Sequence, residues 1–577
     1  MPTRETDRQS GSSYLYRALV DAGVETVIGI PGAQTVPFDK LVAERDDMDY
    51  VMARHETAIP HIAWGYYEAS GAMAATVTIP GPGDTNVSTG LKNALSNGIP
   101  MIHIASDVDD ADRPREPVHE IEPETFDNVV KENIQVSSRL RLPEQISRAI
   151  AVAREPPTGP VRLGIPKDML ASDFAAPAAD VTAERTTYDN ETAYDRAATL
   201  LSDAERPLLF VGGGARRTAD GVRVVEQLAD RLNAPVASSY NGKGVFPEDD
   251  PRALGVTGKH MPEPGIDVVR SADAVLALGT DFDILATNSW TLPIEGSLVH
   301  VDIDPTSIGN HYPTAVPIVA DVTDAAEALL DRLDPVGEGR STGWDGSAIG
   351  QAVRSDYDAH LDRQGALDDT DPTSTPAAMH AVREAVPEDA IVTVDVGAFR
   401  LWAMQTFPAF TPGNYITSGS WAGMGYGLPS AIGAALAEPD RPVLTLTGDG
   451  GFYMCIHELH TAVENDANLV AVVFNNGGYG SIINKSPEIS DDARTHEFSW
   501  GSPDLTTIAE GFGWNATAVS TTAAVETVVS DALDDDQPHL VEIQTKRNQL
   551  TAADAAGYDS PLDLDQFGVS TGSATDN

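Results

Sequence analysis

The segment at residues 441–482 constrains the fold most, because it has the pattern of one strand–helix–strand unit. Two short apolar runs, 443–447 and 469–474, are typical of buried strands. A helical pattern covers about 453–464 between them, and glycine- and asparagine-rich turns separate the three pieces. A crossover of this length joins parallel strands, often neighbours in one sheet. Further alternation of strands and helices along the chain predicts doubly wound parallel sheets.

Polar residues follow both strands of this unit. Asp449 follows the first strand and Asn476 the second, so we expect both at the same sheet edge, where open α/β sheets bind ligands. A carboxylate, an amide oxygen and the backbone carbonyl of Gly478 suit Mg²⁺. The amides of Gly450 and Gly451, at a helix N-terminus, can receive a diphosphate. The loop has no Walker lysine, which argues against a nucleotide triphosphatase.

The GDG at residues 448–450 and the NN at 475–476 resemble the thiamine diphosphate (ThDP) motif of the acetolactate synthase and benzoylformate decarboxylase superfamily. The alternative is a glycine turn and an asparagine turn in an ordinary α/β sheet. The resemblance implies an α/β protein with three doubly wound parallel-sheet domains. Their predicted order is a pyrimidine-binding domain at 1–173, a linker at 174–190, a central domain at 191–334, a linker at 335–375, a diphosphate-binding domain at 376–551, and an acidic mobile tail at 552–577.

Three weaker motifs in the first 90 residues, GIPGA, RHE and GPGDTN, resemble the superfamily's pyrimidine-binding domain in order and spacing. The resemblance implies that Glu56 is the catalytic glutamate that contacts the aminopyrimidine ring nitrogen and so promotes loss of the thiazolium proton. A glutamate at a helix start is otherwise a partner of the helix dipole.

The resemblance also implies the remaining contacts. Met424 would wedge beneath the cofactor, and the carbonyl of Ala422 would accept from its exocyclic nitrogen; a methionine packed in the core is the alternative. The other cofactor contacts are Pro31, Gly32, Gly397, Ala398, Gly450 and Gly451; the metal ligands are Asp449, Asn476 and Gly478; the substrate contacts are Ala33, His119 and Ile482. For His119, a surface or core role is the alternative.

The middle of the chain departs from the acetolactate synthase pattern. Leu285 stands at the apparent position of an arginine that lies near flavin and substrate, and Lys485 at that of a tryptophan on the substrate arm. The segment GKHMPEPG also differs from the usual one. Because an apolar leucine cannot bind a phosphate or a carboxylate, these differences argue against bound FAD and against strict acetolactate specificity.

The charge is extreme, with 87 acidic against 38 basic residues and a net charge of −49. The acids are spread along the chain, which is typical of a surface that stays soluble in concentrated salt. We therefore expect a halophilic, cytoplasmic protein. Such a charge makes nucleic acid or an anionic membrane an improbable partner, and no apolar run is long enough to span a membrane.

The expected activity is a ThDP- and Mg²⁺-dependent decarboxylation of a 2-oxo acid followed by carboligation, as in acetolactate synthase. The alternatives are a decarboxylase without carboligation, such as a benzoylformate or phenylpyruvate decarboxylase, another ThDP lyase or carboligase, and a homologue without turnover. In this superfamily the glutamate and the metal site come from different subunits. The resemblance therefore implies a homodimer or homotetramer with the active site at the subunit interface.

Overall fold

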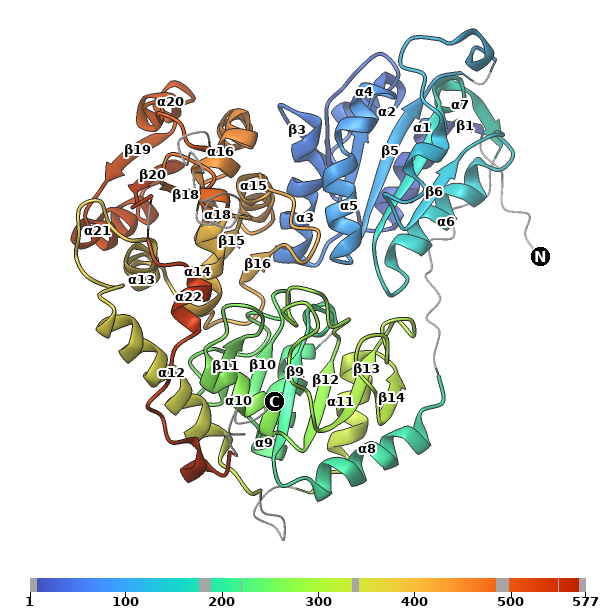
Figure 1. Cartoon of the computed structure of the whole chain (residues 1–577). Coiled ribbons are helices and arrows are strands. Elements are labelled where there is room, and N and C mark those ends of the chain that lie inside the picture. The colour runs from blue at the N-terminus through green and yellow to red at the C-terminus, as the bar shows by residue number, and fades with distance from the viewer. Residues whose placement is uncertain are drawn as a thin grey trace.

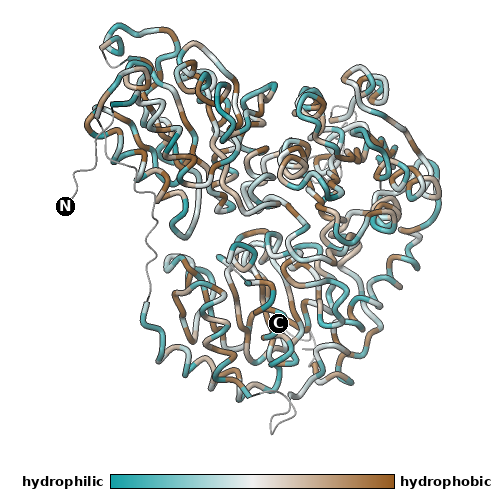
Figure 2. The backbone as a smooth tube through the Cα atoms, turned by 180° about the vertical axis from the view of Figure 1, so that it is seen from behind, coloured by the Kyte–Doolittle hydropathy of each residue, from teal (hydrophilic) through white to brown (hydrophobic). Residues whose placement is uncertain are grey.

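The computed structural model describes residues 8–109, 111–175, 188–218, 220–334, 342–483, 498–547 and 549–569 of the 577. They form three domains, each built on a six-stranded sheet whose strands are all parallel, with helices on both faces (Figure 1). This confirms the predicted fold class. Apolar residues recur along the central strands of each domain, and polar residues along the outer helices (Figure 2). Among the described residues, no helix combines the length and apolar character needed to cross a membrane.

The first domain has the sheet order β3-β2-β4-β5-β7-β6. Its parallel strands are β2 (Thr26–Gly29), β3 (Asp49–Met52), β4 (Ala75–Thr78), β5 (Met101–Asp107), β6 (Glu132–Gln135) and β7 (Pro160–Pro166). Its helices are α1 (Gly11–Asp21), α2 (Val36–Glu44), α3 (Ile59–Ser70), α4 (Pro82–Asn86), α5 (Ser88–Ser96), α6 (Leu142–Arg154) and α7 (Lys167–Ala171), with 3-10 turns η1 (Glu56–Ala58), η2 (Arg113–Arg115) and η3 (Pro123–Phe126). A short antiparallel pair, β1 (Arg8–Ser10) with β8 (Asp173–Ala175), ties its two ends together.

The central domain has the sheet order β11-β10-β9-β12-β13-β14. Its strands are β9 (Pro207–Val211), β10 (Val236–Ser238), β11 (Ala253–Val256), β12 (Ala274–Leu278), β13 (Ser297–Asp302) and β14 (Val316–Val319). Its helices are α8 (Glu191–Asp203), α9 (Gly221–Leu232), α10 (Glu263–Ser271) and α11 (Val322–Leu330), with a 3-10 turn η4 (Gly213–Arg217). The linker predicted at 174–190 lies mostly outside the described residues.

The last domain has the sheet order β16-β15-β17-β18-β20-β19. Its strands are β15 (Ile391–Val394), β16 (Tyr415–Thr417), β17 (Val443–Gly448), β18 (Val470–Asn475), β19 (Asn515–Val519) and β20 (His539–Gln544). Its helices are α13 (Thr375–Ala385), α14 (Ala398–Thr406), α15 (Gly427–Ala437), α16 (Asp449–Cys455), α17 (Leu459–Glu464), α18 (Gly480–Ile483), α20 (Leu505–Gly511) and α21 (Thr522–Leu533), with a 3-10 turn η5 (Ile456–Glu458). The long helix α12 (Gly346–Arg363) leads into this domain from the central one (Figure 1).

The chain after the last sheet is packed as far as Val569, so the prediction of a mobile tail from residue 552 is wrong for these residues. Helix α22 (Ala552–Ala556) is followed by a 3-10 turn η7 (Leu564–Phe567). Leu564 and Val569 are buried in an apolar cluster of the central domain. The reason is that this stretch, although acidic and small in composition, carries enough apolar residues to bury. Residues 570–577 lie outside the described range.

The first and last domains pack through α3 and α15, which lie side by side (Figure 1). The two helix backbones approach so closely that a Cβ on Gly65 would lie 1.8 Å from the carbonyl oxygen of Ser430, and one on Gly433 1.9 Å from that of Ile62. One apolar cluster runs through both domains. The absence of side chains at the two glycines is therefore what allows this contact.

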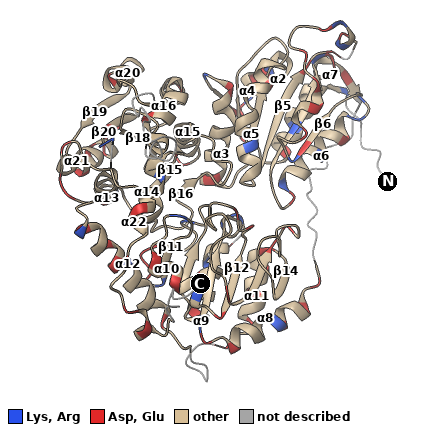
Figure 3. Ribbon diagram, viewed as in Figure 1, with Lys and Arg blue, Asp and Glu red and all other residues tan. Residues whose placement is uncertain are grey.

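The central domain is held against the first by a buried ion pair. Glu68, on α3, accepts from Arg217 at 3.0 Å and from Arg216 at 3.5 Å, and both arginines lie on η4. Burial alone would raise the pKa of Glu68, but the two guanidinium groups outweigh it and hold this pKa below its usual value. Acidic residues outnumber basic ones in the sequence, and residues of both kinds occur in all three domains (Figure 3).

We predict that Gly65→Ala lowers the free energy of unfolding by at least about 2 kcal/mol, because the new methyl group overlaps backbone that cannot move aside. Gly511→Ala is the matched control, since Gly511 ends α20 and has open space around its Cβ position. This control should change stability by less than about 1 kcal/mol. Urea denaturation in concentrated salt measures both, and equal midpoints for the two variants would contradict the prediction.

Candidate active site

The predicted strand–helix–strand unit is confirmed as β17–α16/α17–β18. The two strands are hydrogen-bonded parallel neighbours, with Gly448 opposite Phe474 in the register. Asp449 and Asn476 therefore begin at the same sheet edge. The helix differs from the prediction, because it starts at Asp449 and is interrupted by the 3-10 turn η5 at Ile456–Glu458. An acidic residue in a first helical turn is favoured by the helix dipole, which explains the earlier start.

The side chains of Asp449 and Asn476 converge on one backbone amide. The N–H of Gly478 donates to Oδ2 of Asp449 at 3.1 Å and to Oδ1 of Asn476 at 3.2 Å. Asn475 shapes this turn, since its Oδ1 accepts from the amide of Gly477 at 3.0 Å and its Nδ2 donates to Glu542 at 2.7 Å. The three predicted metal ligands thus meet in one place. We call the turn at residues 475–478 the metal loop.

Asp449 is a buried carboxyl group, only 2% exposed. Burial raises its pKa to about 6, and the main groups that oppose this shift are backbone amides, those of Gly450 and Gly478 first. No cationic side chain is among these groups, so at neutral pH the ionised carboxylate is under-compensated. A divalent cation would supply the missing positive charge, and a carboxylate beside an amide oxygen is a ligand set that Mg²⁺ accepts.

The N-terminus of α16 has no room for side chains at its two glycines. A Cβ on Gly450 would lie 2.9 Å from the ring of Tyr479, and one on Gly451 2.5 Å from Oδ2 of Asp395. Because both positions are bare backbone, their amides at the helix start can face a bound anion. Ala398 also belongs to this region, since its Cβ lies 3.3 Å from the Cβ position of Gly480.

The loop at residues 418–426 contains Ala422 and Met424 and lies beside the same helix. We call it the cradle loop. Ala422 has a left-handed backbone with φ of 51°, which is rare for a residue other than glycine and costs free energy. Gly425, three residues later, also has a positive φ, and its Cβ position lies 3.4 Å from the carbonyl oxygen of Gly451. The strained loop therefore adjoins the predicted diphosphate site, as a cofactor cradle requires.

Asp395 is a residue of this site that the sequence interpretation missed. It follows β15, is fully buried, and accepts from the amide of Gly425 at 3.0 Å and from the hydroxyl of Thr447 at 3.0 Å. Burial raises its pKa to about 6. It joins the cradle loop to β17. Its position directly after a buried strand and two residues before Gly397 could have identified it.

Two side chains of the first domain also form hydrogen bonds with the cradle loop of the last domain. Asn93, on α5, accepts from the hydroxyl of Ser418 at 2.8 Å, and Asn97 accepts from the amide of Gly419 at 2.9 Å. Both asparagines are buried. No motif in the sequence indicated them, because their role depends on packing between domains.

A second group of predicted residues gathers in the first domain around Glu56. Nδ2 of Asn86 donates to the Glu56 carboxylate at 3.0 Å, and the Cβ position of Gly83 lies 3.6 Å from it. Ile79 contacts the Cβ positions of both Gly83 and Gly32, which places the loop at Pro31–Ala33 beside the same turn. Asn86 is the last residue of the GPGDTN motif, but the sequence does not indicate its bond to Glu56.

His119 lies next to this group. It has a left-handed backbone with φ of 69°, and the Cβ position of Gly81 lies 2.8 Å from its carbonyl oxygen. Its Nδ1 is buried without a hydrogen-bond partner among the described residues. Ile482 lies on α18, which follows the metal loop in the chain, and it is 40% exposed. Lys485 lies outside the described residues.

Within one chain, the predicted residues thus form two groups rather than one. Glu56, the Pro31–Ala33 loop and His119 lie in the first domain, whereas the metal loop and the cradle lie in the last. The bonds of Glu56 and Asp449 described above remain within their own domains. The two groups therefore lie in different domains of the chain.

Comparison with known proteins assigns the family. Models of the thiamine pyrophosphate enzymes match all three domains: the N-terminal TPP binding domain at residues 9–129, the central domain at 194–329, and the C-terminal TPP binding domain at 395–543. The chain belongs to the thiamine pyrophosphate enzyme family. Thiamine pyrophosphate is ThDP, so the match of both TPP-binding domains supports this cofactor.

Relatives of this ThDP enzyme include a probable acetolactate synthase large subunit of Methanococcus aeolicus, 28% identical over 92% of this chain and 91% of the relative. Acetolactate synthase isozyme 1 large subunit of Escherichia coli is 29% identical over 94% and 95%. A probable 2-ketoarginine decarboxylase of Pseudomonas aeruginosa is 33% identical over 84% and 85%. The chain is thus acetolactate synthase-like, with a decarboxylase among its relatives.

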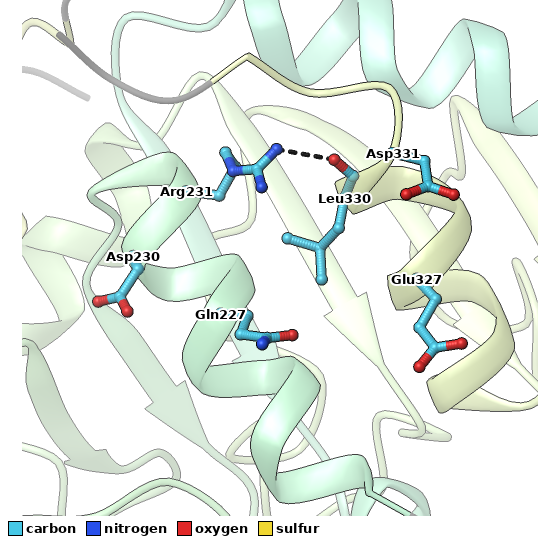
Figure 4. Close-up of a pocket in the computed structure, with 6 residues that line it drawn as sticks. All are labelled: Gln227, Asp230, Arg231, Glu327, Leu330 and Asp331. Carbon is cyan, nitrogen blue, oxygen red and sulfur yellow. Dashed lines mark hydrogen bonds between the residues drawn. The ribbon is translucent and has the colours of Figure 1, made fainter.

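A cavity of about 570 Å³ opens elsewhere in this ThDP enzyme, between α9 and α11 of the central domain (Figure 4). Arg231 donates to the carbonyl oxygen of Leu330 at 2.7 Å across it. The lining residues are Gln227, Asp230, Arg231, Glu327, Leu330 and Asp331. None of them is a predicted site residue, so this cavity is separate from the candidate active site.

We predict that Asp449→Asn stabilises the cofactor-free protein at pH 8 while it abolishes Mg²⁺-dependent ThDP binding. The raised pKa means that protonation of Asp449 favours the folded state fully below pH 3.8 and that this stabilisation is lost as the pH rises through about 6. The neutral amide should therefore raise the free energy of unfolding by on the order of 1–3 kcal/mol at pH 8.

Denaturation and calorimetry with ThDP and Mg²⁺ measure the two effects. Asp504→Asn is the control, because the Asp504 carboxylate caps α20 on the surface and its pKa is lowered to about 2. This control should leave ThDP affinity unchanged. Unaltered affinity in Asp449→Asn would remove Asp449 from the metal site.

Proposed function

We propose that the protein decarboxylates a 2-oxo acid with ThDP and Mg²⁺ and then ligates the product to an acceptor, as acetolactate synthases do. The observation that carries the proposal is the convergence of Asp449 and Asn476 on the Gly478 amide, at the start of α16. Bound ThDP would supply a carbon nucleophile that attacks the 2-oxo group and then stabilises the charge left by decarboxylation. The similarity to acetolactate synthases favours the carboligation step.

The chain's own residues have separate roles in this proposal. Asp449, Asn476 and the Gly478 carbonyl would bind Mg²⁺, and the amides of Gly450 and Gly451 would bind the diphosphate. The other cofactor contacts would come from Pro31, Gly32, Gly397, Ala398, Ala422 and Met424. Glu56, held by Asn86, would donate a hydrogen bond to the aminopyrimidine nitrogen and promote ionisation of the cofactor.

The substrate would be bound by Ala33, His119 and Ile482. The buried Nδ1 of His119 has no partner among the described residues, so it is available to a substrate group. A second candidate function is decarboxylation without carboligation. It is favoured by Leu285, which packs against the apolar cluster around Tyr240 where the resemblance expects an arginine, and by the similarity to a probable 2-ketoarginine decarboxylase.

We also propose that the site is completed between two copies of the chain, in a homodimer or homotetramer. The first-domain half-site of one copy would face the last-domain half-site of the other. Large apolar side chains are exposed around the latter: Trp421 by 47%, Met454 by 45%, Tyr479 by 40% and Ile482 by 40%. A partner subunit and the cofactor would cover them. The halophilic and cytoplasmic character stays a prediction from the charge of −49.

We predict that the purified protein, in multimolar KCl with ThDP and Mg²⁺, converts pyruvate or a longer 2-oxo acid to a ligated 2-hydroxy-3-oxo acid. Glu56→Gln should bind ThDP normally but exchange the thiazolium proton at least about 100-fold more slowly, because an amide is a poor proton donor. Proton exchange is followed by NMR and products by chromatography. Glu44→Gln, on the exposed face of α2, is the control.

A wild-type exchange rate in Glu56→Gln would remove this residue from catalysis. Free aldehyde as the main product would favour the simple decarboxylase. An absence of turnover with every 2-oxo acid, despite bound ThDP, would support a homologue without turnover.

We further predict that the protein purifies without flavin, because Leu285 offers no cation to a phosphate group. Visible absorbance after gentle purification in concentrated salt is the measurement. A stoichiometric flavin spectrum would contradict this prediction and strengthen the similarity to acetolactate synthases.

A further inference from the structure

Glu458 is a fully buried carboxylate between the first and last domains. It lies in η5, the 3-10 turn that interrupts the helix that starts at Asp449. At this interruption of the helix, the last domain therefore extends an acidic side chain into the first domain. Burial of a carboxylate is costly unless it is hydrogen-bonded, so its partners indicate why it is there.

These partners are backbone amides of the RHE turn. Oε1 of Glu458 accepts from the amide of His55 at 2.9 Å and from that of Arg54 at 3.1 Å. Oε2 accepts from the amide of Arg54 at 3.2 Å and from the hydroxyl of Thr461 at 2.5 Å. One carboxylate thus binds two successive N–H groups, which is a strong, charge-assisted arrangement.

The two amides directly precede Glu56. His55 is the N-cap of η1, where its Nδ1 accepts from the amide of Thr57 at 3.2 Å, and Glu56 is the first residue of that turn. The direction of the Glu56 side chain depends on this backbone. Asn86 fixes its carboxylate from the other side. Glu458 and Asn86 together leave the Glu56 carboxyl group little freedom.

Neighbouring side chains reinforce the contact at its edge. Nε of Arg54 donates to Nδ1 of His460 at 2.7 Å, and its guanidinium lies 3.8 Å from Glu464. Nε2 of His457 lies 3.2 Å from Oε1 of Glu458, and the rings of His55 and His457 lie 5.6 Å apart. These groups are partly exposed, whereas Glu458 is not, so the buried carboxylate is the central member of the contact.

We propose that Glu458 is a positioning residue for catalysis, which holds the Arg54–His55 backbone so that Glu56 points at the cofactor ring. The inference rests on the proposed role of Glu56. A residue of the last domain would thereby set the geometry of a proton transfer made by the first. Because displacement of a catalytic group by about 1 Å can cost about 100-fold in rate, loss of this contact should slow proton transfer more than it weakens cofactor binding.

The test measures thiazolium proton exchange in the full-length holoenzyme with saturating ThDP and Mg²⁺, in concentrated salt. Glu458→Leu keeps most of the volume but removes the acceptor, and it should slow exchange at least about tenfold. Its ThDP dissociation constant should stay within about threefold of wild type. Glu458→Gln retains one acceptor oxygen and should restore the rate to within about threefold.

Glu464→Gln is the matched control, because Glu464 is exposed, contacts the same Arg54, and does not touch the two amides. It should exchange at the wild-type rate. If Glu458→Leu does not fold, Thr461→Val replaces it, since loss of the Thr461 hydroxyl frees the carboxylate and should slow exchange about fivefold.

A wild-type exchange rate in whichever of these two variants folds would overturn the proposal. So would a Glu458→Gln rate as slow as that of Glu458→Leu, or a parallel loss of ThDP affinity and exchange, which would indicate support of the metal loop alone. A wild-type protein that neither binds ThDP nor exchanges the proton would instead refute the proposed function.

Discussion

The close packing of α3 against α15 is the contact on which the candidate site depends. Backbone meets backbone at Gly65 and Gly433, so the first and last domains approach more closely than side chains would allow. At that separation, Glu458 reaches the amides of Arg54 and His55, and Asn93 reaches Ser418. The two half-sites of one chain are thereby set relative to each other by helix backbone, which is stiffer than a contact between long side chains.

Three buried carboxyl groups, those of Glu68, Glu458 and Asp449, are compensated in different ways. Glu68 is compensated by two arginines, and Glu458 by backbone amides, a hydroxyl and the adjacent His457 ring. Burial raises the pKa of Asp449, and among the described residues the main groups that oppose this rise are backbone amides. The first two arrangements are formed within the chain and join its domains. Asp449 is the one of the three that gains from an added cation, and such under-compensation is typical of a binding site.

The architecture could be predicted from the sequence because parallel strands buried on both faces are short apolar runs between glycine-rich turns. The order of β17 and β18, and with it the meeting of Asp449 and Asn476, followed from the crossover rule. The break in the helix at Ile456–Glu458 could not be predicted from the local sequence, because it coincides with bonds from Glu458 to Arg54 and His55, which are about 400 residues away in the chain.

The same limit applies to Asn93 and to the tail. Their partners lie hundreds of residues away or in another domain, and periodicity carries no information about such pairs. Composition alone predicted a mobile end after residue 552, whereas a few apolar residues suffice to fix it.

That fixed end affects how the protein is made. Leu564 and Val569 fill a cluster whose other members, such as Leu208 and Val353, belong to the central domain and to α12. Tyr558 and Ser560 add bonds of 2.6 Å to Asp356. On the ribosome, the middle of the chain emerges well before these residues exist. The central domain therefore stays incomplete until residues 558–569 have been synthesised, and its exposed apolar surface is open to chaperones for the time needed to synthesise the whole last domain.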